Sequence, residues 1–314
     1  MGGASSHCTQ CIEREEGDGD PAPGLGVGGA LIDEPIGLSL RTNVEALISA
    51  KESSAALSAR RSTTSASLAA GGEWSGQAYD GHGVLERLDG GRYEGQFLSG
   101  KVHGVGKLLY PNGDTYEGEW HENRAQGRGK FVHKDGSSYD GQWHQDLQQG
   151  VGTEVWADGS TYEGNFLSSQ KHGQGKVSWA DGTGYEGEFR ENEIHGSGCY
   201  RWPDGRTYTG EWHCNRIHGF GHMVWLDGQR YSGQFVEDRK HGEGCFAWPD
   251  GQQYSGQWSH GKQHGSGIYM NPKRKVRAGS WNSGKRTSFT SEERDPNPSD
   301  GFLEVQLLPP TCSR

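Results

Sequence analysis

The stretch that decides the fold is Tyr-Glu-Gly-Glu-Trp at residues 116–120. A glycine stands between two large aromatic residues in a segment that alternates like a β-strand, although glycine weakens strands. In a strand, Tyr116, Gly118 and Trp120 face one side and the two glutamates face the other. A glycine between aromatic residues leaves a slot over which rings of neighbouring strands can lie. The segment therefore predicts burial of aromatic rings on one face of a sheet.

The same pattern recurs at intervals of 23 residues. A Gly-x-Gly follows each pentad, as at Gly104 and Gly106, and an Asp-Gly or Asn-Gly comes next, as at Asn112-Gly113. We expect the latter dipeptides to form type I′ hairpin turns, which need positive φ at both central residues. Each unit therefore predicts strand, loop, strand and tight turn. The tyrosine of the pentad occupies Tyr93, Tyr116, Tyr139, Tyr162, Tyr185, Tyr208, Tyr231 and Tyr254.

The composition fits a repeat array better than a compact globule. Leu, Ile, Val and Phe make up about 15% of the residues, a level that by itself suggests disorder. The net charge of −10 is modest for a disordered chain, and 53 glycines need another explanation. A period of roughly 20 to 50 residues predicts stacked units that each bury apolar surface on their neighbours, so that no large central core is needed.

The pentad, the His-Gly-Ser-Gly at 195–198 and the Asp-Gly turn resemble the MORN (membrane occupation and recognition nexus) repeat. The resemblance covers residues 70 to about 281. It implies an all-β fold: an elongated, single-layer, twisted antiparallel sheet of about nine to ten 23-residue hairpins, with a groove. Complete units run from about 93 to 270, and the incomplete units on either side are expected to act as caps.

The two ends of the chain differ from the repeats. Residues 1–69 are rich in Gly, Ser and Ala and are expected to be flexible, and residues 282–314 are expected to form a loose tail. Within the first region, a capping box at 42–45 predicts a helix near 43–60. This helix is either a partly formed element of a linker or a segment that folds back onto the aromatic face or onto a partner.

The N-terminus carries a pattern for lipid attachment. Gly2 after Met1, with Ser6, fits the N-myristoylation motif. One myristoyl chain binds membranes only marginally, so a second signal is needed, and palmitoylation at Cys8 or Cys11 would supply it. The sequence therefore predicts lipidation at Gly2, Cys8 and Cys11, with an unmodified tail as the alternative.

No enzyme, cofactor or metal site is predicted. No nucleophile with a base and an orienting partner can be assembled from the spacing, so no catalytic residue is named. The histidines before Gly-x-Gly, such as His195 and His218, lie one unit apart, about 10 Å on a sheet. Zinc ligands must converge to about 2.0–2.1 Å from one ion. Cys8-x-x-Cys11 has no second cysteine pair.

The first functional hypothesis is a noncatalytic scaffold whose groove binds a helix or extended peptide of a partner protein. The resemblance implies this, because similar repeat proteins do so in cilia and cytoskeletal assemblies. Contact is expected through aromatic residues of the middle units, where such residues are the usual signature of protein contact. These residues are Tyr162, Trp179, Tyr185, Trp202, Tyr208 and Trp225.

The alternatives are a lipid-binding module that contacts phospholipids directly through the repeats, or a regulator of phosphoinositide signalling. Acidic residues beside the pentad glycine, such as Glu94 and Glu117, oppose binding of anionic lipid. A third reading places the segment 43–60 in the groove. Mild acidity argues against nucleic acid. We find no secretory signal or spanning segment and expect a cytoplasmic protein, at the inner face of a membrane or in a cilium or flagellum. End-to-end self-association stays open.

Overall fold

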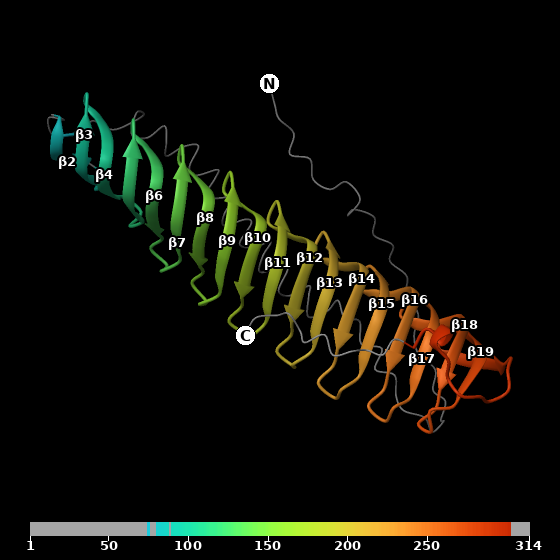
Figure 1. The fold of residues 1–314 in the computed structure, drawn as a ribbon. Coiled ribbons are helices and arrows are strands. Elements are labelled where there is room, and N and C mark those ends of the chain that lie inside the picture. Colours follow the sequence, from blue (N-terminus) through green and yellow to red (C-terminus); the bar gives the residue numbers. More distant parts are fainter. Residues whose placement is uncertain (1–73, 76–79, 88, 303–314) are drawn as a thin grey trace, which may run out of the picture.

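The computed structural model describes residues 74–75, 80–87 and 89–302. These residues form one antiparallel sheet of twenty strands, in which strands adjacent in sequence pair with each other. Figure 1 shows the strands as a single row that twists along its length, without a second layer of described elements. The predicted all-β class and the hairpin array are confirmed. The helix expected near 43–60 and the lipidation sites Gly2, Cys8 and Cys11 lie outside the described residues.

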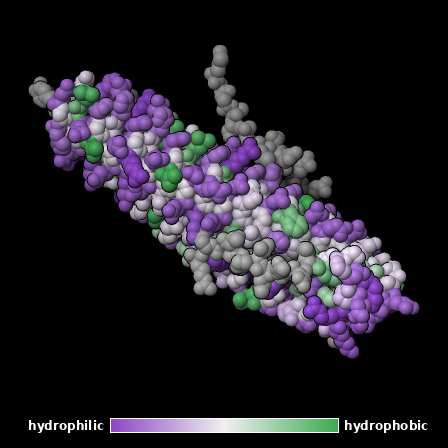
Figure 2. All heavy atoms as spheres, viewed as in Figure 1, coloured by the Kyte–Doolittle hydropathy of each residue, from purple (hydrophilic) through white to green (hydrophobic). Residues whose placement is uncertain are grey.

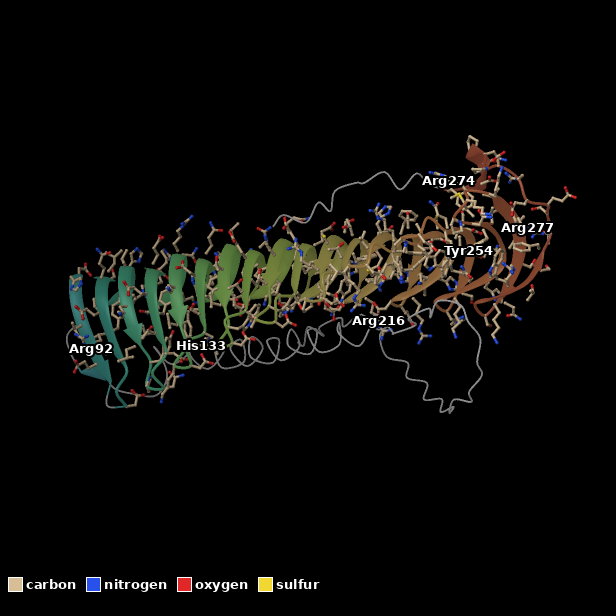
Figure 3. The ribbon with its side chains drawn as sticks, turned by 90° about the horizontal axis from the view of Figure 1, so that it is seen from below. Arg92, His133, Arg216, Tyr254, Arg274 and Arg277 are labelled. Atoms are coloured by element: carbon tan, nitrogen blue, oxygen red, sulfur yellow. The ribbon has the colours of Figure 1, made fainter. Side chains whose placement is uncertain are left out.

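The strands alternate between seven and nine residues over most of the array, because the pentad strand is shorter than the Gly-x-Gly strand. In Figure 3, which shows the sheet from below relative to Figure 1, Arg92 lies near one end of the sheet and Arg277 near the other. The strands are β1 (Trp74–Ser75), β2 (Gly81–Arg87), β3 (Arg92–Leu98), β4 (Lys101–Leu109), β5 (Thr115–His121), β6 (Arg124–Val132), β7 (Ser138–His144), β8 (Leu147–Val155), β9 (Thr161–Leu167), β10 (Gln170–Ser178), β11 (Gly184–Arg190), β12 (Glu193–Arg201), β13 (Thr207–His213), β14 (Arg216–Val224), β15 (Arg230–Val236), β16 (Arg239–Ala247), β17 (Gln253–Ser259), β18 (Lys262–Met270), β19 (Val276–Asn282) and β20 (Lys285–Phe289).

The two turns of each unit differ from the turns that we expected. The predicted type I′ geometry at Asp-Gly is wrong, because Gly205 has a φ of +87° whereas Asp204 does not have positive φ. The N–H of Gly205 donates to the carbonyl of Trp202 at 3.1 Å, which fits a type I turn followed by a left-handed glycine. The type I′ turn instead follows the pentad strand, where Cys214 and Asn215 have φ of +49° and +65°.

The second residue of this type I′ turn connects adjacent hairpins. The side-chain oxygen Oδ1 of Asn215 accepts a hydrogen bond from the backbone N–H of Ile194, 21 residues earlier, at 2.7 Å. Asp146 and Asp238 accept the same bond in their own units, both at 2.8 Å. The turn therefore both closes one hairpin and holds the preceding one.

The substitution Asn215→Ala is expected to lower the free energy of unfolding by about 1–2 kcal/mol. It removes a hydrogen bond to a backbone donor and places alanine at positive φ, where asparagine is favoured. Asn215→Asp is the matched control and should lose much less, because Asp146 and Asp238 occupy the same position. Urea titrations followed by circular dichroism measure both variants, and an equal loss for aspartate and alanine would contradict the role of the side-chain oxygen.

The C-terminal boundary lies later than the sequence predicts. Beyond residue 281, where a loose tail was expected, β20 pairs with β19 and completes the last hairpin. The backbone N–H of Val276 then donates to the carbonyl of Arg294 at 2.9 Å, and Arg294 forms an ion pair with Asp300. A short 3₁₀ turn at Pro298–Asp300 is capped by Asn297. The described chain is therefore ordered by specific contacts as far as residue 302.

Candidate functional site

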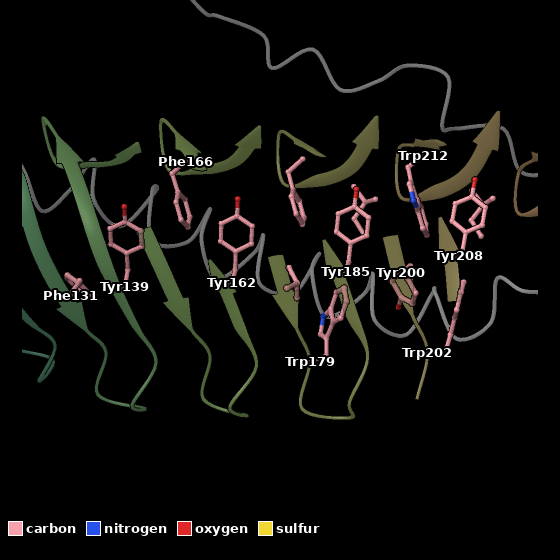
Figure 4. Close-up of a cluster of buried hydrophobic side chains, with 14 of the residues drawn as sticks. Phe131, Tyr139, Tyr162, Phe166, Trp179, Tyr185, Tyr200, Trp202, Tyr208 and Trp212 are labelled. Carbon is pink, nitrogen blue, oxygen red and sulfur yellow. The ribbon is translucent and has the colours of Figure 1, made fainter. Parts of the chain in front are cut away.

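The aromatic face is the side of the sheet that carries the pentad tyrosines. The ring of Tyr185 is 1% exposed and meets Phe189 of its own strand edge to face, with centroids 5.2 Å apart. It meets Trp212 of the next hairpin in the same way at 5.6 Å. Figure 4 shows this arrangement repeating from Tyr139 to Tyr208. Each hairpin therefore buries its aromatic area against the next one, as the pentad predicts.

The pentad glycine and the second glycine of Gly-x-Gly make room for the tyrosine ring. A Cβ on Gly187 would lie 2.5 Å from the Cα of Gly198 on the paired strand, and a Cβ on Gly198 would lie 2.3 Å from Oη of Tyr185. The slot expected at the pentad glycine is therefore present, but the ring that lies over it is Tyr185 of the same strand, and Gly198 on the paired strand makes room for that ring as well. The first glycine of Gly-x-Gly is needed for a different reason. Gly196 has a φ of +59° in a β-bulge between β11 and β12.

Tyrosine hydroxyls on this face are satisfied by the backbone rather than left for a ligand. Oη of Tyr185 donates to the carbonyl of Glu188, three residues along the same strand, at 3.0 Å. Burial raises the pKa of Tyr93 to about 12, although its hydrogen bond to the Gln96 carbonyl opposes the shift. Burial likewise raises the pKa of the tyrosines deeper in the array, namely Tyr162, Tyr185, Tyr208, Tyr231 and Tyr254.

These shifts predict loss of stability in alkali. Tyrosines of the unfolded chain ionise near pH 10, whereas the pKa of Tyr93 in the fold is about 12. The folded state thus holds more protons above pH 10, and the free energy of unfolding falls as the pH rises from 10 towards 12. Below pH 10 the buried tyrosines are protonated in both states, so their full contribution to the free energy of unfolding is present. Tyrosinate absorbance and circular dichroism, recorded together, should change in parallel, and full ionisation without loss of structure would contradict the prediction.

A row of tryptophans lies along the aromatic face, one residue in each of five consecutive units, just before the Asp-Gly turn. We call this set the tryptophan row. Trp202 is 1% exposed and Trp179 is 8% exposed, while the other three are half-buried. Within the described residues, the indole N–H groups of Trp156 and Trp202 have no hydrogen-bond acceptor. The row consists of Trp156, Trp179, Trp202, Trp225 and Trp248.

The six predicted groove residues therefore fall into two groups. Tyr162, Tyr185 and Tyr208 are at most 1% exposed and hold the hairpins together. Trp179, Trp202 and Trp225 belong to the tryptophan row, and of these three Trp225 is the half-buried one. Trp156 and Trp248 were missing from the predicted set, although the recurrence of tryptophan before the turn was the signal for them.

A buried lysine and a partly exposed arginine lie against rings of the aromatic face, which sequence reasoning did not predict. Lys171 is 3% exposed, its Nζ is 2.7 Å from Oε2 of Glu154, and it lies 4.8 Å from the centroid of the Trp156 ring. The guanidinium of Arg206 lies 5.3 Å from the centroid of the Trp202 ring. Arg206 is also paired with Asp204 at 2.6 Å, so both cations contact aromatic rings while a carboxylate balances their charge.

The opposite face is polar. Its acidic side chains pair with lysines across the strands, as for Glu117 with Lys107 at 3.4 Å. Exposed apolar residues such as Val151, at 59%, and Phe220, at 46%, stand apart from one another. The view in Figure 2 shows a mainly hydrophilic surface with separate hydrophobic residues. None of the helical segments that the structure describes is long and apolar enough to cross a bilayer.

Comparison with known proteins identifies a repeat family. The family model described as MORN repeat matches eight consecutive segments, and no curated protein matches the chain significantly. The eight segments are residues 93–115, 116–138, 139–161, 162–184, 185–205, 208–230, 231–253 and 254–273.

Three solved structures are similar to the chain at low scores. The TCP10 domain of Danio rerio CPAP is 15% identical over 67% of this chain and 100% of that one, with a TM-score of 0.38. The CPAP G-box domain is 13% identical over 69% and 100%, with a TM-score of 0.31. The SAS-4 TCP domain of Drosophila melanogaster, in complex with a proline-rich motif of Ana2, is 10% identical over 56% and 90%, with a TM-score of 0.32. These scores carry no conclusion about function.

Proposed function

The chain belongs to the MORN repeat family, and from that premise we propose that it is a noncatalytic scaffold that binds a partner protein along the tryptophan row. Proteins of this family are generally repeat scaffolds without catalytic activity that bind proteins or membranes. The observation that carries the proposal is a row of large aromatic side chains on one face of a single-layer sheet, of which Trp156, Trp225 and Trp248 are partly exposed. Tryptophan is among the residues that contribute most to binding energy at protein interfaces.

The row sets the size of the partner segment. Two strands per unit, each about 4.8 Å wide, place successive tryptophans roughly 10 Å apart. The four intervals from Trp156 to Trp248 therefore span roughly 40 Å. An amphipathic helix of about 27 residues or an extended peptide of about 12 residues covers that length. The indole ring of Trp156 is half-buried and can offer apolar contact area to such a segment, whereas its N–H is buried.

Crosslinking from defined positions tests this proposal. A photoreactive phenylalanine analogue replaces Trp225 on the aromatic face in one variant and Val151 on the opposite face in the control. We expect protein adducts of defined mass in cells from position 225 and far fewer from position 151. Equal adducts from both positions would contradict a binding site on the aromatic face.

Membrane attachment is a separate part of the proposal and concerns residues outside the described range. Acylation of Gly2, with Cys8 or Cys11, would place the scaffold at the cytoplasmic face of a membrane, including that of a cilium or flagellum. Mass spectrometry of the mature N-terminus tests it. The triple variant Gly2→Ala/Cys8→Ser/Cys11→Ser should not sediment with phosphatidylserine vesicles, and sedimentation would favour the lipid-binding alternative instead.

A further inference from the structure

Two histidines and a cysteine come together where β12, β13 and the turn after β13 meet. Gly196 pairs with Trp212, so that His195 and His213 are the next residues outward on the two strands. Their ring centroids are 5.1 Å apart. Cys214 is the first residue of the turn, and its Sγ lies 3.9 Å from Nε2 of His213. One ligand atom from each of the three residues lies within 4.8 Å of the other two.

We propose that His195, His213 and Cys214 form a binding site for Zn²⁺ or a cation of similar chemistry. A thiolate with two imidazoles is a ligand set that zinc prefers, and a site with three protein ligands leaves the fourth tetrahedral position to water. His218 stands nearby, its ring centroid 5.9 Å from that of His213. Bond lengths of about 2.0–2.3 Å to one ion require the ligand atoms to close to roughly 3.3–3.8 Å, which rotation of half-buried side chains allows.

All three candidate ligands are half-buried, which leaves a route from solvent to the cluster.

Other units carry part of this arrangement but not all of it. His103 and His121 form the same cross-strand pair, with ring centroids 5.0 Å apart, but residue 122 is glutamate instead of cysteine. Among the residues that the structure describes, His195, His213 and Cys214 are the one group with this spacing. The chain thus contains its own control, a histidine pair without a thiol.

Cobalt titration tests the site directly. The full-length chain is used with Cys8→Ser and Cys11→Ser, which removes the only Cys-x-x-Cys sequence. We expect one equivalent of Co²⁺ to give visible bands of tetrahedral cobalt and a near-ultraviolet thiolate-to-cobalt band, both displaced by Zn²⁺. Cys214→Ser should abolish the thiolate band. His195→Gln should weaken binding at least about tenfold, the lower end of the loss seen for supporting contacts.

The variants are chosen to keep the fold. Serine occupies the position of Cys214 in three other units, as Ser99, Ser168 and Ser283, and glutamine occupies that of His195 as Gln126 and Gln149. His103→Gln is the matched control and should leave the affinity unchanged, with circular dichroism confirming the fold of each variant. The proposal is overturned if no thiolate band forms, if the band persists in Cys214→Ser, or if His103→Gln weakens binding as much as His195→Gln.

Discussion

Gly187→Ala is expected to lower the free energy of unfolding by about 3 kcal/mol and the melting temperature by about 6–12 °C. The new methyl group would lie 2.5 Å from the Cα of Gly198 and 2.6 Å from the carbonyl oxygen of Ser197. Both are backbone atoms of the paired strand, which no side-chain rotation can move away. The hydroxyl of Tyr185, also at 2.5 Å, blocks the remaining direction. The two strands must separate locally, and the edge-to-face ring contacts between hairpins are lost with them.

The matched control for this change lies three residues away in the same strand. A Cβ on Gly184 finds its nearest neighbour, the carbonyl oxygen of Val177, at an ordinary 3.7 Å. Gly184→Thr should therefore leave stability unchanged or raise it slightly, since threonine suits strands. Thermal and urea unfolding followed by circular dichroism compare the two variants. A similar loss from both would show that the cost is not steric. The same register position holds Thr115, Thr161 and Thr207.

Glu154→Val is expected to lower the free energy of unfolding by about 3–5 kcal/mol. The carboxylate of Glu154 is the ion-pair partner of Lys171, and the two side chains are 16% and 4% exposed. Removing it leaves an ammonium group buried beneath the ring of Trp156 without its counter-charge. Breaking a buried pair from one side is far more destabilising than replacing both members by apolar residues.

The double variant Glu154→Val/Lys171→Ile should recover wild-type stability or exceed it by about 1–4 kcal/mol. Valine and isoleucine already occupy the equivalent positions in the next unit, as the buried residues Val177 and Ile194. A double-mutant cycle measures the coupling between the two positions. A double variant as unstable as Glu154→Val alone would mean that the charges hold the array together in a way that apolar packing does not replace.

The repeat period made the main architecture predictable from sequence. Tyr185 and Gly187 alternate as in a strand, and their recurrence every 23 residues fixes both the face they share and the pairing of hairpins. The turn type was not predictable in this way. An Asp-Gly dipeptide such as Asp204-Gly205 is compatible with a two-residue type I′ loop and with a longer loop that has one left-handed glycine. The dipeptide alone does not give the length of the loop, which distinguishes the two turn types.

The contacts that sequence reasoning missed lie between positions that are not equivalent in the repeat. His195 and His218 occupy the same register position one unit apart, and the expected separation of about 10 Å excluded a shared ion. His213 stands 18 residues from His195, and the antiparallel register brings their rings to 5.1 Å. Glu154 stands where other units carry an apolar or aromatic residue, whereas the position of Lys171 also holds lysine in Lys240, so the pair becomes visible only once the strands are placed side by side.

The connection from Asn215 to Ile194 spans 21 residues, and each strand that the structure describes pairs with the strands next to it in sequence. Low contact order favours rapid folding, and such an array can begin to fold at any hairpin and extend in both directions. The sheet also has no closure condition of the kind that fixes the number of strands in a barrel. Duplication or deletion of one genetic unit of 23 codons would therefore lengthen or shorten the molecule by one hairpin, about 10 Å, without disturbing the joints elsewhere.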